Sequence, residues 1–467
     1  MAKPFIPCIG PSGQLSDRKA AVQRTMNMRV SAVEGLGEDK LAILESFPGL
    51  VSVLAAVQVR GAYVAEVRAF YVVGTDLREM TSEGVSVSRG TLSSSSGFVS
   101  MKHGVSQLVL VDGPSGYVLD LNTNALAQIT SAGWRGSNWV DYIDGYFVFV
   151  DPDTEQFYIS AIDDGSQMDA LDFSSADTQP DNIVTHRAFK RELYLFGARS
   201  TEVWINSGEA DFPFVRYNAT PIQVGAVGLR AVTIAADTLF FVGQTNRGSG
   251  YVYALNGYQP QRISTAAVEQ AIQQATDLSQ IRMWSYHVSG SELIGVEAPG
   301  MTTTWVYDAS TKQWQEQGIK VNGEWTPLGA DHFMFWNREH YCWYADAIHR
   351  IDKDVYLYGV NAIVRERTWP HLVQPSLEPV TYRSLELACT TGTPETLNQT
   401  EGVISLEISN DGGYEFGPPL LKNLGAVGRW MQRVRWMFLG AARDRVFRLR
   451  CSSNVPLSIH AATLDAS

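Results

Sequence analysis

The chain has 467 residues, 45% of them hydrophobic and 18% charged, which leaves room for several domains and excludes a long disordered or coiled-coil protein. Forty glycines and an aromatic share of 11% favour β structure, because glycines form tight turns and flat rings pack on sheets. The net charge of −12 makes the average surface repel nucleic acid and anionic membranes.

Residues 1–48 differ in pattern from the sequence that follows them. Their side chains are mostly small or polar, and the segment ends in the turn-forming sequence Ser46-Phe-Pro-Gly-Leu50. We expect these residues to form an N-terminal arm rather than a repeat.

A short apolar and aromatic run then recurs seven times along the chain. The runs start at Ala69, Gln107, Tyr146, Glu192, Thr238, Glu292 and His340. Their spacings of 38 to 54 residues lie near the ~40–50 residues typical of propeller blades. Most runs are followed by a second strand, such as residues 116–121, so each pair reads as a hairpin within a blade. We predict a β-propeller of about six blades over residues 49–365, with the seventh run either completing the ring or starting the next domain.

The clearest helix is predicted over Thr265–Gln280. One stripe of this segment is apolar, and Ser264 and Thr265 are candidate N-terminal caps.

Beyond about Arg367 the sequence changes character. The breaker sequence Thr368-Trp-Pro-His marks a boundary, and period-two strands follow at residues 402–408, 433–439 and 445–451. We predict a β-sandwich-like platform domain over residues 366–467, to which the arm of residues 1–48 contributes. The fold class is therefore mainly β, a propeller with a sandwich-like platform.

Seven arginines and one acid, Asp444, lie between Arg429 and Arg450, a local charge of +6 that leaves −18 for the rest of the chain. Period two places four of the arginines on one sheet face: Arg433, Arg435, Arg448 and Arg450. The opposite, apolar face is predicted to carry Val434, Trp436, Phe438, Phe447, Leu449 and Cys451. An arginine face suits an acidic protein partner or phosphate, because guanidinium groups bind carboxylate and phosphate bidentately. The alternative is a solvated face balanced by the acidic remainder.

Sequence signatures of enzymes are absent from the chain. There is no phosphate-binding or dinucleotide fingerprint, no H-E-x-x-H and no G-x-S-x-G. His332, His340 and His349 lie near acidic residues, but their spacing favours ordinary blade histidines over a metal site. We therefore predict no catalytic residues, no metal and no cofactor.

One hairpin leaves an alternative function open. Residues 409–416, Ser-Asn-Asp-Gly-Gly-Tyr-Glu-Phe, resemble the Asp-box of sialidases, in which the aspartate bonds turn amides and the aromatic ring packs beneath. We favour this structural role, since the motif occurs once and outside the blade period. A carbohydrate-binding or sialidase-like propeller remains the alternative.

Cysteine usage and hydropathy indicate the cellular compartment in which the chain assembles. The four cysteines lie far apart, which suggests neither a zinc ribbon nor a disulfide framework and fits assembly in a reducing compartment. The first residues lack a signal peptide, and no apolar run approaches ~18 residues, so we expect neither export by a visible signal nor stable membrane insertion.

A set of short segments carries a family resemblance. They are Asn27-Met28, Ser46–Leu50, Phe173–Ala176, Gln179–Asp181 with Ile183, Leu193–Gly197, Ser200–Trp204, Phe241–Gly243, Gly257–Pro260, Ile263–Glu269 and Val306–Asp308 with Trp314. In their order and spacing they resemble the tail-hub, or packaged-DNA stabilisation, family of short-tailed bacteriophages.

That resemblance implies a non-enzymatic virion protein. Such a protein forms a six-fold nozzle ring of identical subunits below the portal and its adaptor ring, and it retains packaged DNA and provides the channel for DNA ejection. The implied partners are the adaptor (head-to-tail connector) protein, tail fibres or tailspikes, and a tail needle or plug, with transient non-specific contact to passing viral DNA. The implied location is the virion tail, after assembly in the host cytoplasm. The acidic body suits a conduit to which DNA does not adhere, and the arginine face suits docking on an acidic adaptor.

Overall fold

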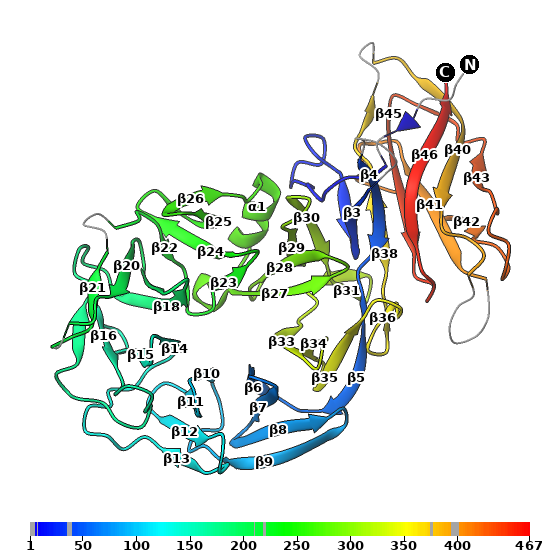
Figure 1. The fold of residues 1–467 in the computed structure, drawn as a ribbon. Coiled ribbons are helices and arrows are strands. Elements are labelled where there is room, and N and C mark those ends of the chain that lie inside the picture. Colours follow the sequence, from blue (N-terminus) through cyan, green and yellow to red (C-terminus); the bar gives the residue numbers. More distant parts are fainter. Residues whose placement is uncertain are drawn as a thin grey trace.

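The computed structural model describes residues 5–6, 8–34, 40–209, 211–217, 221–373, 377–393 and 401–467. The chain forms a ring of small sheets and, beside it, a two-layer sandwich that contains the first and the last described strands (Figure 1). The predicted fold class, mainly β with a propeller and a sandwich, is confirmed. Parts of the predicted arm, at residues 1–4, 7 and 35–39, lie outside the described residues.

Each blade of the ring is an antiparallel sheet. The first three blades are β6 (Val59–Ala65), β7 (Arg68–Val73), β8 (Asp76–Ser82) and β9 (Val85–Thr91); β10 (Ser100–His103), β11 (Gln107–Val111), β12 (Gly116–Asp120) and β13 (Leu126–Gln128); and β14 (Val140–Ile143), β15 (Tyr146–Val150), β16 (Gln156–Ile159) and β17 (Phe173–Ser175). The next three are β18 (Ile183–Phe189), β19 (Glu192–Gly197), β20 (Thr201–Asn206) and β21 (Phe214–Arg216); β22 (Gly225–Ala226), β23 (Val232–Ala235), β24 (Thr238–Thr245), β25 (Gly248–Asn256) and β26 (Gln259–Arg262); and β27 (Arg282–Val288), β28 (Ser291–Glu297), β29 (Thr304–Asp308) and β30 (Gln313–Gln317). A hairpin of β31 (Ile319–Val321) and β32 (Glu324–Thr326) follows the sixth blade.

A seventh blade closes the ring, so the predicted number of about six is one too low. It consists of β33 (Asp331–Trp336), β34 (Glu339–Tyr344), β35 (Ala347–Asp352) and β5 (Gly49–Ala55), with β36 (Leu357–Tyr358) and β37 (Asn361–Ala362) beyond β5. β5 precedes the first blade in the chain and pairs antiparallel with β35. The seventh run therefore completes the ring. A count of periodic runs underestimates the blades because this blade draws its fourth strand from the other end of the propeller sequence.

The apolar runs are strands buried on both faces. In β15, Phe147 and Phe149 pack with Val109 of the preceding blade, whereas Val148 and Val150 pack with the following blade. Such a strand has no solvent face, so its sequence is continuously apolar instead of alternating. Stacked blade faces make up most of the propeller core.

The predicted helix is shorter than its sequence pattern. The helix α1 covers Ala266–Gln273, and a 3₁₀ turn, η1, follows at Leu278–Gln280. The backbone N–H of Thr276 donates to the carbonyl of Pro299 at 2.9 Å, and the side chain of Asp277 caps the turn. These contacts end the helix before the predicted Gln280.

Two sheets form the sandwich. One contains β3 (Met28–Glu34), β4 (Lys40–Ser46), β46 (Ser458–Ala466), β40 (Val380–Cys389) and β43 (Val434–Met437), with β1 (Phe5–Ile6) and β44 (Ala441–Ala442) paired to it. The other contains β38 (Arg365–Thr368), β45 (Asp444–Cys451), β41 (Val403–Ser409) and β42 (Leu420–Asn423), with β39 (Leu372–Val373) paired to β45. Their apolar faces share one core, which includes Met28 and Leu44 from the N-terminal strands.

The propeller and the sandwich share a continuous sheet. β2 (Arg24–Met26) pairs with the outer strand β30 of the sixth blade on one side and with β38 on the other. β38 in turn pairs with β45 of the sandwich. Ten strands are thus hydrogen-bonded across the junction.

No helix of the described residues has the length and apolar character needed to cross a bilayer. All four cysteines are free thiols, and Cys8, Cys342 and Cys451 are buried.

Candidate functional sites at the propeller axis and on the sandwich

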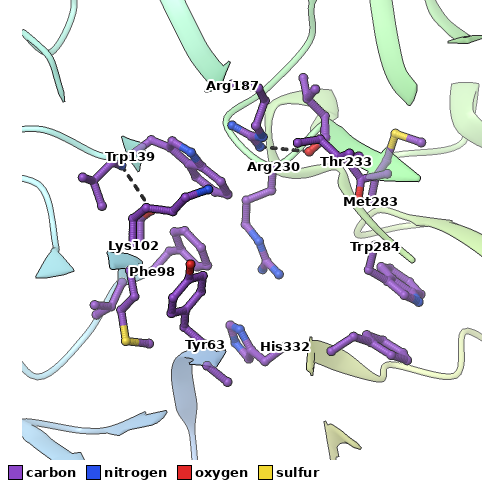
Figure 2. Close-up of a pocket in the computed structure, with 18 of the residues that line it drawn as sticks. Tyr63, Phe98, Lys102, Trp139, Arg187, Arg230, Thr233, Met283, Trp284 and His332 are labelled. Atoms are coloured by element: carbon purple, nitrogen blue, oxygen red, sulfur yellow. Dashed lines mark hydrogen bonds between the residues drawn. The ribbon is translucent and has the colours of Figure 1, made fainter. Parts of the chain in front are cut away.

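The innermost strands of the seven blades surround a cavity of about 320 Å³ on the propeller axis. An aromatic stack narrows it. The ring of Phe98 lies between that of Trp139, with centroids 5.7 Å apart, and that of His332, 6.1 Å away, and both neighbours are nearly parallel to it. Figure 2 shows these rings and Arg230 reaching into the middle of the cavity. Side chains therefore narrow the axis to this small cavity.

Two arginines complete this stack. The guanidinium carbon of Arg187 lies 3.6 Å from the ring centroid of Trp139, and that of Arg230 lies 4.6 Å from that of Phe98. Arg187 donates to Thr185 Oγ1 at 2.7 Å and to the backbone carbonyls of residues 186, 229 and 232. Burial, the largest effect, lowers the pKa of Arg187 to about 9. The hydrogen bonds and the ring contact fix this guanidinium in place.

The two carboxylates that line the cavity are paired with cations. Lys102 Nζ lies 2.7 Å from Asp141 Oδ1, and Asp331 Oδ2 accepts from Arg230 at 2.9 Å and from Arg282 at 3.0 Å. Burial alone would raise the pKa of Asp141, but the charge of Lys102 makes the net shift downward, and the pKa of Asp331 is also lowered. A glycosidase needs a general acid with a raised pKa. Neither lining carboxylate meets that requirement.

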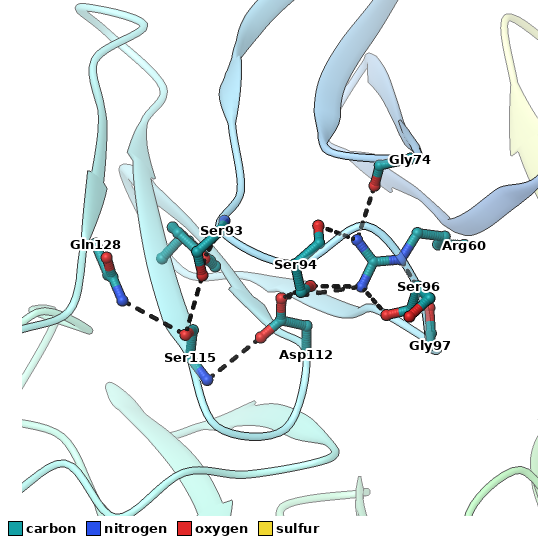
Figure 3. A network of polar contacts seen from close by, with 10 residues as sticks. Arg60, Gly74, Ser93, Ser94, Ser96, Gly97, Asp112, Ser115 and Gln128 are labelled. Carbon is teal, nitrogen blue, oxygen red and sulfur yellow. Dashed lines mark hydrogen bonds and ion pairs between the residues drawn. The ribbon is translucent and has the colours of Figure 1, made fainter.

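A polar network holds the loop that carries Phe98 (Figure 3). The buried Arg60 donates to the carbonyls of Gly74 at 2.7 Å and of Ser94 and Gly97 at 2.8 Å each. Asp112 accepts from the Ser94 hydroxyl. The loop after the first blade is thereby fixed against the axis. Sequence reasoning missed Arg60 and Phe98, which carry no motif and lie outside the periodic runs.

The four predicted docking arginines do not share a face. Arg433 directly precedes β43 and Arg435 lies within it, whereas Arg448 and Arg450 lie in β45. The expectation of a single arginine face is wrong, because the two strands belong to opposite sheets of the sandwich. Period two gives the side of its own strand on which a residue lies, but not the sheet to which the strand belongs.

The apolar side of these strands is as predicted except at one residue. Val434, Trp436, Phe447, Leu449 and Cys451 are all buried in the sandwich core. Phe438 is 91% exposed, because β43 ends at Met437 and the backbone turns there with φ +59°.

Arg448 and Arg450 belong to a row of alternating charges along the shared sheet. Arg450 donates to Glu366 at 2.7 Å and to Glu407 at 3.0 Å, and Arg448 Nε donates to Glu407 at 2.7 Å. The row continues across the junction, where Arg24 lies near Glu366 and forms a 2.7 Å ion pair with Glu316 of the sixth blade. Glu366 is buried, which would raise its pKa, but the charge of Arg450 and then that of Arg24 lower it. Both arginines are thus used inside the protein.

Arg433 lies in a more open setting. Its side chain is 67% exposed and forms a bidentate pair with Glu386, with two contacts of 2.7 Å. Arg435 is less exposed and donates to the hydroxyl of Ser384 at 2.9 Å. Of the four predicted residues, Arg433 is the one most available to a partner.

Two further arginines, Arg365 and Arg367 of β38, are buried at the domain boundary, and their role was not predicted. Arg365 donates to the carbonyl of Val455 at 2.5 Å, and Arg367 donates to that of Cys8 at 2.7 Å. They tie loops of the sandwich and of the N-terminal arm to the shared sheet. Their position in a boundary segment that reads as polar concealed this role.

The Asp-box hairpin has the structural role favoured from sequence. Asp411 Oδ1 accepts from the backbone N–H groups of Tyr414 at 3.0 Å and Glu415 at 3.1 Å. The ring of Phe416 lies 3.6 Å from the guanidinium carbon of Arg448. The carboxylate is used to form the turn, and the hairpin lies in the sandwich, away from the propeller axis.

The three histidines considered for metal binding each make a different contact. His332 stacks on Phe98 at the axis, the Nε2 of His340 accepts from the backbone N–H of His287, and His349 bonds a backbone carbonyl. Within the described ranges, no three His, Cys, Asp or Glu side chains are grouped so as to hold a metal ion.

The fold and these sites define a class of protein, a seven-bladed propeller joined to a β-sandwich by a shared sheet. Two family models match the chain: bacteriophage P22 Gp10, β-propeller, over residues 23–354, and bacteriophage P22 Gp10, β-sandwich, over residues 366–467. The chain belongs to this family, the tail hub or nozzle family of short-tailed phages. It is a structural protein of the phage tail, of the P22 type, and assembles there with other virion proteins. No curated protein matches the chain.

The chain is also similar, at low sequence identity, to several solved structures. The computationally designed Ika8 protein is 12% identical, with a TM-score of 0.39 over 71% of this chain and 99% of that one. The extracellular domain of the hybrid two-component system BT4673 from B. thetaiotaomicron is 11% identical, with a TM-score of 0.45 over 86% and 58%. The WD40 domain of Toxoplasma gondii coronin is 8% identical, with a TM-score of 0.39 over 69% and 85%.

Proposed function

We propose that the chain is the hub, or nozzle, subunit of a short phage tail. In this proposal, six copies form a ring below the portal and adaptor. The ring retains the packaged DNA and later provides the channel for its ejection. The observation that carries the proposal is the family match over both the propeller and the sandwich.

The geometry of the propeller supports a channel between subunits. The axial cavity of about 320 Å³ is narrowed by the stacked rings of Phe98, Trp139 and His332 and offers far too little space for a DNA duplex. Passing DNA would then touch the outer surfaces of the propellers. The net charge of −12 supports transient, non-specific contact, because attractive phosphate contacts would slow ejection.

The shared sheet at the junction supports a mechanical role for the subunit. The ten-stranded sheet and its row of charges, from Glu316 to Glu407, join the propeller to the sandwich without a flexible linker. A subunit that holds DNA under pressure must keep its two parts in fixed register. We place the sandwich, with Arg433 on its open side, toward an acidic surface of the adaptor, and the fibres or spikes and the needle or plug at other surfaces. Assembly takes place in the host cytoplasm.

Electron microscopy of virions tests the proposal. We expect six-fold density for this chain between the adaptor and the distal end of the tail, and we expect particles made without the chain to lose DNA. The proposal fails if the chain is absent from purified tails, or if particles without it retain their DNA.

A further inference from the structure

Exposed apolar side chains lie along one edge of the sandwich, from Trp430 beside Thr391 to Phe438 beside Arg383. Seven of them lie within residues 420–438: Leu420, Leu421, Val427, Trp430, Met431, Met437 and Phe438. Their exposed fractions reach 65% for Trp430, 93% for Met431 and 91% for Phe438. The edge strands β42 and β43 meet here, one from each sheet, and Trp436 Nε1 donates to the Leu420 carbonyl at 2.7 Å. We call these seven residues the open edge.

Phe438 is held outward by its backbone. Its φ of +59° lies in the left-handed region, which a bulky side chain avoids. The N–H of Phe438 donates to the carbonyl of Arg383 at 2.7 Å, and the next residue, Leu439, is buried in the core. The fold therefore maintains an unfavourable backbone conformation that leaves an aromatic ring in water. Backbone strain of this kind clusters at functional sites.

The surroundings of the open edge are basic. Lys422, Arg429, Arg433 and Arg443 are exposed around it, in a chain whose net charge is −12. Among the described residues, Arg433 pairs with Glu386, whereas Lys422, Arg429 and Arg443 form no ion pair. Trp, Met, Phe and Arg are also the residues enriched at the centres of protein interfaces.

We propose that the open edge docks on a different virion protein whose surface carries an apolar groove with an acidic rim. Trp430 and Phe438, toward opposite ends of the open edge, would be the anchors, and Arg429 and Arg433 would pair with the rim carboxylates. This inference rests on the proposed function and adds the surface and the chemistry of the partner. The basic rim favours an acidic partner over a phosphate-bearing one, because the apolar side chains at its centre have no counterpart on a phosphodiester backbone.

Binding of the purified full-length chain to phage particles assembled without it tests the proposal. Co-sedimentation gives the fraction bound. We expect Trp430→Ala with Phe438→Ala to weaken binding at least 10-fold, and Arg429→Glu with Arg433→Glu to weaken it and flatten its salt dependence. The matched control is Val105→Ala with Leu171→Ala, which truncates two exposed apolar side chains of the propeller and should bind as the wild type does.

The outcomes separate the two proposals. If the wild-type chain does not bind these particles, the proposed function fails. If the wild type binds and the Trp430 and Phe438 variant binds equally well, the docking proposal is overturned. A photo-crosslinker at Met431 identifies the occupant: we expect adducts on another virion protein next to Asp and Glu residues. Adducts on a second copy of this chain would contradict the proposal.

Discussion

The propeller axis and the open edge of the sandwich both combine arginines with aromatic rings, but the axis buries them and the edge exposes them. At the axis, Arg187 and Arg230 lie on Trp139 and Phe98, and their donors are taken by carbonyls and by Asp331. At the open edge, Trp430 and Phe438 face water beside exposed arginines. Arginines and aromatic rings whose contacts are made within the protein stabilise the fold, whereas those left exposed are available to bind a partner. The comparison predicts stability effects at the axis and binding effects at the edge.

Removal of Arg187 should have the largest effect. We expect Arg187→Ala to lower the free energy of unfolding by about 4 kcal/mol, because buried carbonyls lose their donor and Trp139 loses its cation. Urea unfolding followed by tryptophan fluorescence measures the change. The control is Arg191→Ala, at an exposed hairpin position, with an expected change of less than about 0.5 kcal/mol. Equal stabilities of the two variants would contradict the prediction that the contacts of Arg187 at the axis stabilise the fold.

Acid should weaken the region around the axis through His186. Burial, the largest effect, lowers the pKa of His186 to about 4, from an ordinary value of about 6.5. Between these values the unfolded chain binds more protons, so stability falls as the pH drops from about 6.5 to 4, by about 3 kcal/mol for this group. Unfolding free energies at several pH values should decline less steeply in His186→Gln than in the wild type. His460→Gln, at an exposed position of the sandwich, should leave the slope unchanged.

Charge reversal should destabilise the protein more at one of the two pairs of predicted docking arginines than at the other. Arg448→Glu places a carboxylate against Glu407 and removes the contact with Phe416, so we expect a loss of about 2 kcal/mol. Arg433→Glu breaks an exposed pair with Glu386 and should cost less than about 1 kcal/mol. Thermal unfolding of both variants makes the comparison. Similar losses would mean that the row of charges at the junction carries no more stability than the exposed pair.

The smallest expected effect has the opposite sign. Phe438→Gly relieves the left-handed backbone of a bulky residue and should raise the free energy of unfolding by about 1 kcal/mol, while binding to particles weakens. Phe438→Ala removes the ring but keeps the backbone strain, so it should weaken binding without the gain in stability. Melting temperature and co-sedimentation of both variants measure the two quantities. Loss of stability in Phe438→Gly would show that the ring supports the fold.

Part of the candidate sites was predictable from local pattern. The alternation in residues 433–451 correctly predicted Val434, Trp436, Phe447 and Leu449 as core, and the Asp-box was correctly assigned a structural role. The docking role of Arg433, Arg435, Arg448 and Arg450 remains a prediction, now favoured for Arg433. The role of Phe98 could not be predicted, because it depends on an arginine, Arg60, that is 38 residues away in the sequence and holds the loop through backbone carbonyls.

The sequence by itself determined the two kinds of domain, the recurrence of the blades and the family. Those properties follow from local periodicity and from short segments in a fixed order, which folding does not rearrange. Only the tertiary structure decided the number of blades, the narrowing of the axis and the separation of the arginines. Each of these depends on which distant strand lies next to which, as when β5 completes the seventh blade or β43 and β45 enter opposite sheets. Strand periodicity fixes the side on which a residue lies and carries no information on the partner strand.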